Sequence, residues 1–136
     1  DAVGRLYSHL PVKRCYDGFM DLATWSLAGL VGLAILSHIT TFLFHIRSDE
    51  FYNYFHLIAG ILAVFLFYSF TGSYVLSIVL TELVGIAWEV YEWCLWKLVL
   101  KKKKFQPQTD ETGNDLFVDF VGSLFGVAAL ALWIGK

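Results

Sequence analysis

The stretch LATWSLAGLVGLAILSHITTFLF, residues 22–44, decides the fold class because it contains no Asp, Glu, Lys or Arg. A helix that crosses the hydrocarbon core of a bilayer needs about 20 mostly apolar residues. This run is long enough and apolar enough, and a basic residue, Arg47, follows its end. We therefore predict a first membrane-crossing helix over residues 22–44.

Three further apolar runs follow along the chain, over residues 52–70, 74–100 and 115–134. The links between the helices are short, and short links place neighbouring helices antiparallel. We therefore predict an all-α fold, an integral membrane four-helix bundle over residues 22–136. A polar lead-in over residues 1–21 precedes it, with Pro11 and Gly18 as helix breakers.

The composition supports this class. The 136 residues are 57% hydrophobic and 16% charged, whereas soluble domains are about 45–50% apolar and about 25% charged. The near-balanced charge argues against a nucleic-acid partner, and the two cysteines argue against a disulfide scaffold. The lipid bilayer is the predicted partner, and the predicted location is the cell membrane, crossed several times.

The third apolar run contains three carboxylates at positions inside the membrane, where a charged group is unfavourable. In TELVGIAWEVYEW, residues 81–93, helical geometry places Glu82, Glu89 and Glu92 on one face, with Gly85 between them. A carboxylate at the bilayer centre costs roughly 2.5–3.5 kcal/mol on insertion scales. We therefore expect these three side chains to face the interior of the bundle.

The fourth run opens with two acids four residues apart, Asp115 and Asp119, and continues on the same face with Gly122 and Gly126. The Gly-x-x-x-Gly spacing favours close packing of helices in lipid. For Asp115, a role as a helix N-cap is an equal alternative to a role in a polar site. Asp119 lies one turn further inside, where capping does not explain it.

Antiparallel topology brings these acids together with a histidine. The second run begins on the same side of the membrane as the third ends and the fourth begins, so His56 lies at their depth, with Gly60 below it. We predict a polar site near one membrane face. Its candidate residues are His56, Glu82, Glu89, Glu92, Asp115 and Asp119. Among them, the predicted metal ligands are Glu89, Glu92, Asp119 and His56, and the predicted packing glycines are Gly60, Gly85, Gly122 and Gly126.

The lysine run Lys101–Lys104 follows the third helix. We predict that it anchors the topology or contacts anionic lipid. His45 and Arg47 fall on the same side of the membrane.

The pattern FHLIAG, ELVGIAWEVYEW and QTDETGNDLFVDFVGSLFG resembles small VanZ-like membrane proteins, closest to the YjdF-like branch. The positions that carry the resemblance are His56, Gly60, Glu82, Gly85, Trp88, Glu89, Glu92, Asp110, Asp115, Asp119, Gly122 and Gly126. It covers about residues 52–132. The resemblance implies a small helical membrane protein but no settled reaction. The member that gives the family its name is associated with glycopeptide-antibiotic resistance.

Three functions fit these residues. The first is a site for a divalent cation or a lipid-linked phosphate, since carboxylates with one imidazole suit Mg²⁺, Mn²⁺ or Zn²⁺. The second is a structural or accessory subunit of a larger membrane complex or a homo-oligomer, with no chemistry of its own. The third is an ion path along Glu82, Glu89 and Glu92. No catalytic residue can be assigned from sequence, and the balance leans away from an enzyme.

Overall fold

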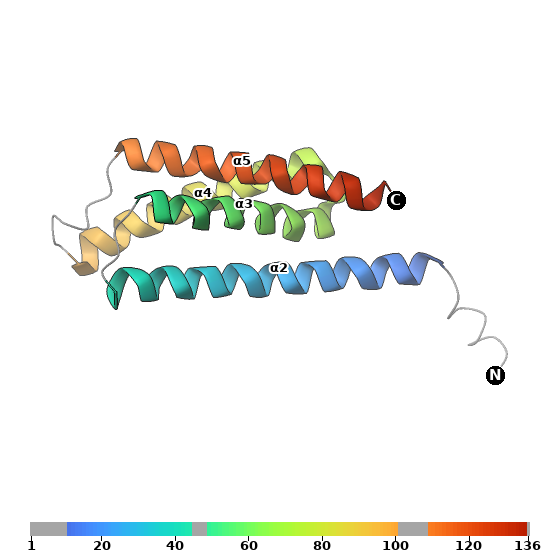
Figure 1. The fold of residues 1–136 in the computed structure, drawn as a ribbon, viewed down its shortest axis with the longest axis horizontal. Coiled ribbons are helices and arrows are strands. Elements are labelled where there is room, and N and C mark those ends of the chain that lie inside the picture. The colour runs from blue at the N-terminus through green and yellow to red at the C-terminus, as the bar shows by residue number, and fades with distance from the viewer. Residues whose placement is uncertain (1–10, 45–48, 101–108, 136) are drawn as a thin grey trace.

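The computed structural model describes residues 11–44, 49–100 and 109–135, and they confirm the all-α fold (Figure 1). The helices are α2 (Pro11–Phe42), α3 (Asp49–Thr71), α4 (Tyr74–Leu95) and α5 (Thr109–Ile134). A π-helical turn, η1 (Trp96–Leu100), continues α4. Four segments are long and apolar enough to cross a membrane: Met20–Phe42 in α2, Phe51–Thr71 in α3, Tyr74–Leu98 in α4 and η1, and Glu111–Ile134 in α5.

Two helix starts differ from the sequence prediction. Helix α2 begins at Pro11 and runs through Gly18, so neither residue breaks it. A proline is well accommodated at the start of a helix, because its missing N–H has no partner there anyway. Helix α5 begins at Thr109, and residues 109–114, expected in a loop, are helical. Asp115 is therefore not an N-cap, since it lies more than a turn inside the helix.

The link between α3 and α4 is a tight turn. Gly72 has φ 63°, a left-handed conformation that favours glycine. Ser73 caps α4 by accepting a hydrogen bond from the backbone N–H of Leu76. This turn places α3 and α4 antiparallel. The start of α3 and the end of α4 therefore lie at the same end of the bundle.

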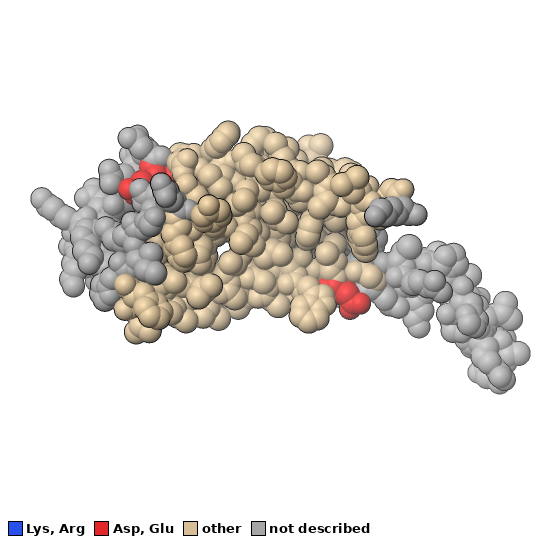
Figure 2. Space-filling view, viewed as in Figure 1, with Lys and Arg blue, Asp and Glu red and all other residues tan. Residues whose placement is uncertain are grey.

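The interior of the bundle is more polar than its exterior. The buried polar residues are Ser26, Thr40, Ser77, Thr81, Glu89, Asp119 and Ser123. The buried apolar residues are Ala23, Ala63, Val64 and Leu130. Large apolar side chains are exposed instead, as for Trp25, Val75 and Leu132 at 73–76%, and Figure 2 shows a face covered almost wholly by uncharged residues. This distribution suits a bundle surrounded by lipid.

Helix α3 occupies the centre of the bundle and packs against α2, α4 and α5 (Figure 1). It crosses α5 closely at two glycines. A Cβ added to Gly60 would collide with the carbonyl oxygen of Asp119, and one added to Gly122 with that of Leu57. Gly126 lies against the backbone of Ile61. The missing side chains thus let two backbones touch, which fixes the depth of His56 relative to the acids of α5.

Candidate functional site

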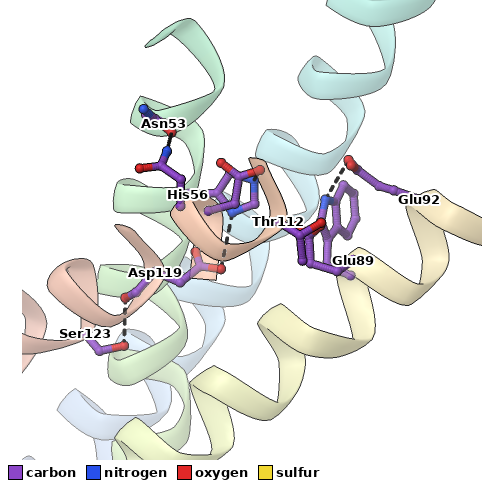
Figure 3. A network of polar contacts seen from close by, with 10 residues as sticks. Asn53, His56, Glu89, Glu92, Thr112, Asp119 and Ser123 are labelled. Carbon is purple, nitrogen blue, oxygen red and sulfur yellow. Dashed lines mark hydrogen bonds and ion pairs between the residues drawn. The ribbon is translucent and has the colours of Figure 1, made fainter. Parts of the chain in front are cut away.

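Helices α4 and α5 pair their polar residues layer by layer. One carboxylate oxygen of Glu89 lies within 4.8 Å of one of Asp115. Four residues away on each helix, a Cβ built on Gly85 would lie 2.8 Å from Asp119 Oδ2. This is the register of antiparallel helices, in which moving back along one moves forward along the other. Figure 3 shows Asp119 of α5 directed toward His56 of α3, with Glu89 of α4 near Thr112 and Glu92 directed apart, toward Trp88.

His56 connects the two acids of α5. Its Nδ1 lies 3.2 Å from Asp119 Oδ2, and its Nε2 lies 3.8 Å from Asp115 Oδ2. The His56 side chain is 12% exposed and that of Asp119 is 7% exposed. An ionised carboxylate can only accept a hydrogen bond, so Nδ1 donates its hydrogen to Asp119. In the neutral ring, Nε2 then holds a lone pair that faces Asp115.

Glu89 has one satisfied and one unsatisfied oxygen. Thr112 Oγ1 donates a hydrogen bond of 2.8 Å to Oε2 (Figure 3). Oε1 is buried and has no hydrogen-bond partner among the described residues, and Glu89 as a whole is only 9% exposed. A buried carboxylate oxygen without a partner is costly. Glu89 therefore keeps one buried carboxylate oxygen that no described group hydrogen-bonds.

His56, Glu89 and Asp115 form a group that can hold a metal ion, because one ligand atom from each lies within 4.8 Å of the others. Zn–N and Zn–O bonds are about 2.0–2.2 Å long, so two ligand atoms of one ion lie at most about 4.4 Å apart. The 3.8 Å between His56 Nε2 and Asp115 falls within that limit. The three residues come from three different helices, α3, α4 and α5.

This group differs from the predicted ligand set. Asp115 takes part in place of Asp119, which is occupied with His56 Nδ1. Glu92 lies one turn beyond Glu89, and its Oε1 accepts a hydrogen bond of 2.9 Å from Trp88 Nε1 (Figure 3). Glu82 lies deeper, within electrostatic range of Asp119, and its buried Oε1 has no described hydrogen-bond partner.

The structure adds polar partners that the sequence did not single out. Thr112 orients Glu89 from the first turns of α5, which were expected in a loop. Tyr91 hydroxyl lies 2.8 Å from His38 Nε2 and joins α4 to α2. His38 Nδ1 lies 2.7 Å from the carbonyl oxygen of Ala34 and so carries the ring hydrogen. His38 is thus a hydrogen-bonded interior histidine outside the metal group.

The predicted contacts of Lys101–Lys104, His45 and Arg47 lie outside the described residues. Lys97 is the one Lys or Arg whose side chain the structure describes, and its Nζ lies 4.2 Å from the centroid of the Trp93 ring. Among the described residues, no Lys or Arg therefore accompanies the acids of the site; His56 lies among them, and His38 lies within electrostatic range of Glu92.

No family model matches the chain, and comparison with curated proteins and with solved structures finds no match either. The VanZ-like resemblance thus stays a prediction from the residues that carry it.

We expect Gly85→Ala to weaken metal binding by about 10–100-fold, the range found when groups that orient ligands are lost. The new Cβ lies 2.8 Å from Asp119 Oδ2, so this carboxylate must turn away from His56. Isothermal titration with Zn²⁺ or Mn²⁺ in detergent measures the change. Gly113→Ala is the matched control, because nothing lies within 4 Å of its Cβ. Equal affinities in the two variants would contradict the orienting role of Asp119.

Proposed function

We propose that this protein is a multi-pass protein of the cell membrane that binds one divalent cation through His56 Nε2, Glu89 Oε1 and a carboxylate oxygen of Asp115. The observation that carries the proposal is that Glu89, one of the three residues of that group, has a buried Oε1 with no hydrogen-bond partner among the described residues. Buried charges in proteins are paired or coordinate metals. A cation among these ligands would satisfy the orphaned oxygen and offset the charges of the carboxylates.

The surroundings of His56 support the proposal independently. A metal-bound histidine commonly donates its other ring hydrogen to a carboxylate, which fixes the tautomer and raises ligand basicity. Asp119 is placed to accept that hydrogen. One imidazole with two carboxylates favours Zn²⁺, Mn²⁺ or Fe²⁺ over Ca²⁺, which prefers oxygen ligands alone. Three protein ligands leave at least one coordination position for water or a substrate.

The same charges disfavour a phosphate group bound directly to protein. Glu89, Asp115 and Asp119 outnumber the single imidazole, and a phosphate would need cations that the described part of the site lacks. A role as an accessory subunit without chemistry predicts no bound metal, so the test below separates it from this proposal. We also propose that the chain is a VanZ-like protein. The support for this is the set of residues that carries the resemblance, such as His56, Glu89 and Asp119.

The test is metal analysis of the protein purified in detergent. We expect about one Zn²⁺ or Mn²⁺ per chain after loading and gel filtration. Asp119→Asn keeps the three ligands but weakens the acceptor of His56 Nδ1–H, so we expect affinity to fall by about 10–100-fold.

Asp21→Asn serves as the control, since Asp21 is exposed on α2 and lies far from the group. A wild-type protein that retains no stoichiometric ion would overturn the proposal. So would an Asp119→Asn variant that binds the ion as tightly as the wild type.

A further inference from the structure

Helix α5 carries a polar residue one turn before and one turn after its own member of the metal group. Thr112 lies three residues before Asp115, and Asp119 lies four residues after it, so the three share one face of the helix. Asp119 accepts the hydrogen of His56 Nδ1 at 3.2 Å, and Thr112 donates a hydrogen bond of 2.8 Å to Glu89 Oε2 (Figure 3). The members of the group on α3 and on α4 are therefore each held by a separate contact from α5.

The bond from Thr112 makes the two carboxylate oxygens of Glu89 unequal. Oε2 is held by the hydroxyl, whereas Oε1 is buried and has no hydrogen-bond partner among the described residues. Glu89 is only 9% exposed, so little water reaches Oε2 to replace the hydroxyl. A carboxylate that binds an ion through both oxygens must bring them about equally close to it. Because Oε2 is tied to Thr112, we expect Glu89 to offer Oε1 alone.

We infer that Thr112 sets the ion selectivity of the site: its hydroxyl keeps Glu89 a ligand of one oxygen, so that the site takes Zn²⁺ and discriminates against Ca²⁺. This inference rests on the proposed cation site. His56, Glu89 and Asp115 then supply three ligand atoms, and one water completes the tetrahedral arrangement that Zn²⁺ adopts. Ca²⁺ takes about six to eight oxygens at longer distances, often including a glutamate bound through both oxygens.

The contacts from α5 also limit how far the site can adapt to a larger ion. Selectivity between cations depends on the number of ligand atoms and on how freely they move. Asp119 fixes the ring of His56, and Thr112 fixes the carboxylate of Glu89. The close crossing of α3 and α5 holds the backbones that carry His56 and Asp115. A ligand set restrained at each of these points suits a small ion with few ligands.

The experiment compares the binding of Zn²⁺ and Ca²⁺ to the full chain in detergent by isothermal titration. Thr112→Val keeps the size and shape of the side chain and removes the hydroxyl, which frees Oε2. We expect Zn²⁺ to bind about 10–100-fold more weakly, the range for loss of an orienting partner, and Ca²⁺ to bind no more weakly than in the wild type. The ratio of the two affinities should therefore fall by at least about tenfold.

Two variants serve as controls. Thr112→Ser keeps the hydroxyl and should keep the wild-type ratio. Thr24→Val removes a hydroxyl of the same kind, which donates a hydrogen bond of 2.8 Å to the carbonyl oxygen of Met20 on α2, and it should match the wild type.

X-ray absorption at the zinc edge tests the wild type directly and needs no variant. We expect about four atoms around the zinc in the loaded protein. A Glu89 bound through both oxygens would raise that number to about five.

Three outcomes overturn the inference. They are a wild-type ratio in Thr112→Val, a ratio in Thr112→Ser that falls as far as in the valine variant, or about five atoms around the zinc of the wild type. If Thr112→Val does not fold, the coordination number of the wild type still decides. In each case the proposed cation site stands as long as the wild type binds one ion per chain. A wild type that binds no stoichiometric ion defeats the proposed function itself, so the two failures are distinguishable.

Discussion

Gly122→Ala is expected to destabilise the folded bundle by at least about 1–3 kcal/mol, the usual cost of overpacking a close contact. The added Cβ would collide with the carbonyl oxygen of Leu57 and lie 3.3 Å from the Cα of Gly60. These are backbone atoms, so no change of side-chain rotamer relieves the clash. Helices α3 and α5 must separate along their whole crossing.

The measurement is the midpoint of thermal unfolding in detergent, followed by the loss of the monodisperse peak in gel filtration. Gly60→Ala is expected to behave likewise, because its Cβ meets the carbonyl of Asp119 from the opposite side. Gly32→Ala is the matched control. Its Cβ has nothing within 4 Å, and alanine is favoured over glycine in a helix by about 1 kcal/mol. A Gly122→Ala midpoint as high as that of Gly32→Ala would contradict the observed crossing.

The sequence predicts the four helices well because a membrane imposes one simple requirement. About 20 apolar residues are needed for each crossing, and the runs that satisfy it, such as residues 22–44, stand out from the polar links. The chain also predicts which end of the bundle holds the site. Short links alternate the helix direction, so the start of α3, the end of α4 and the start of α5 share one side.

Sequence alone could not predict that His56, Glu89 and Asp115 lie together, because this depends on where α5 begins and how it is rotated. The polar segment from Thr109 to Asn114 contains Gly113 and is typical of a loop, yet it is helical. Acidic residues are favoured near a helix N-terminus, which is consistent with this early start. As a result, Thr112 donates a hydrogen bond to Glu89, and Asp115 lies close to Glu89 and His56.

The sequence also could not predict which of the two aspartates contacts which ring nitrogen of His56. Asp115 and Asp119 are one turn apart on one face of α5. From sequence, either aspartate could contact a histidine on α3. The crossing at Gly60 and Gly122 sets the height of His56, so that Nδ1 meets Asp119 and Nε2 faces Asp115. Such a choice between two ring nitrogens depends on shifts smaller than one helical turn.

Glu89→Gln is expected to abolish binding of a stoichiometric divalent cation, a loss of more than about 100-fold in affinity. The variant removes a direct ligand, whereas loss of an orienting partner already costs about 10–100-fold. The neutral amide keeps the size of the side chain, and its oxygen can still accept the hydrogen bond from Thr112. Titration with Zn²⁺ or Mn²⁺ measures the loss, with Asp21→Asn as the control.

The same variant should not unfold the protein, and this is the result that separates a binding site from a structural polar contact. Without metal, Glu89 holds an oxygen that is buried and has no described partner, and a charged carboxylate in a membrane helix costs roughly 2.5–3.5 kcal/mol. Removing that charge relieves the cost, so the metal-free Glu89→Gln protein should unfold at the wild-type temperature or above it. Residues kept for binding are commonly those whose removal stabilises the fold. A metal-free variant that melts well below the wild type would instead make Glu89 a structural residue, whose interior contacts hold α4 against α5.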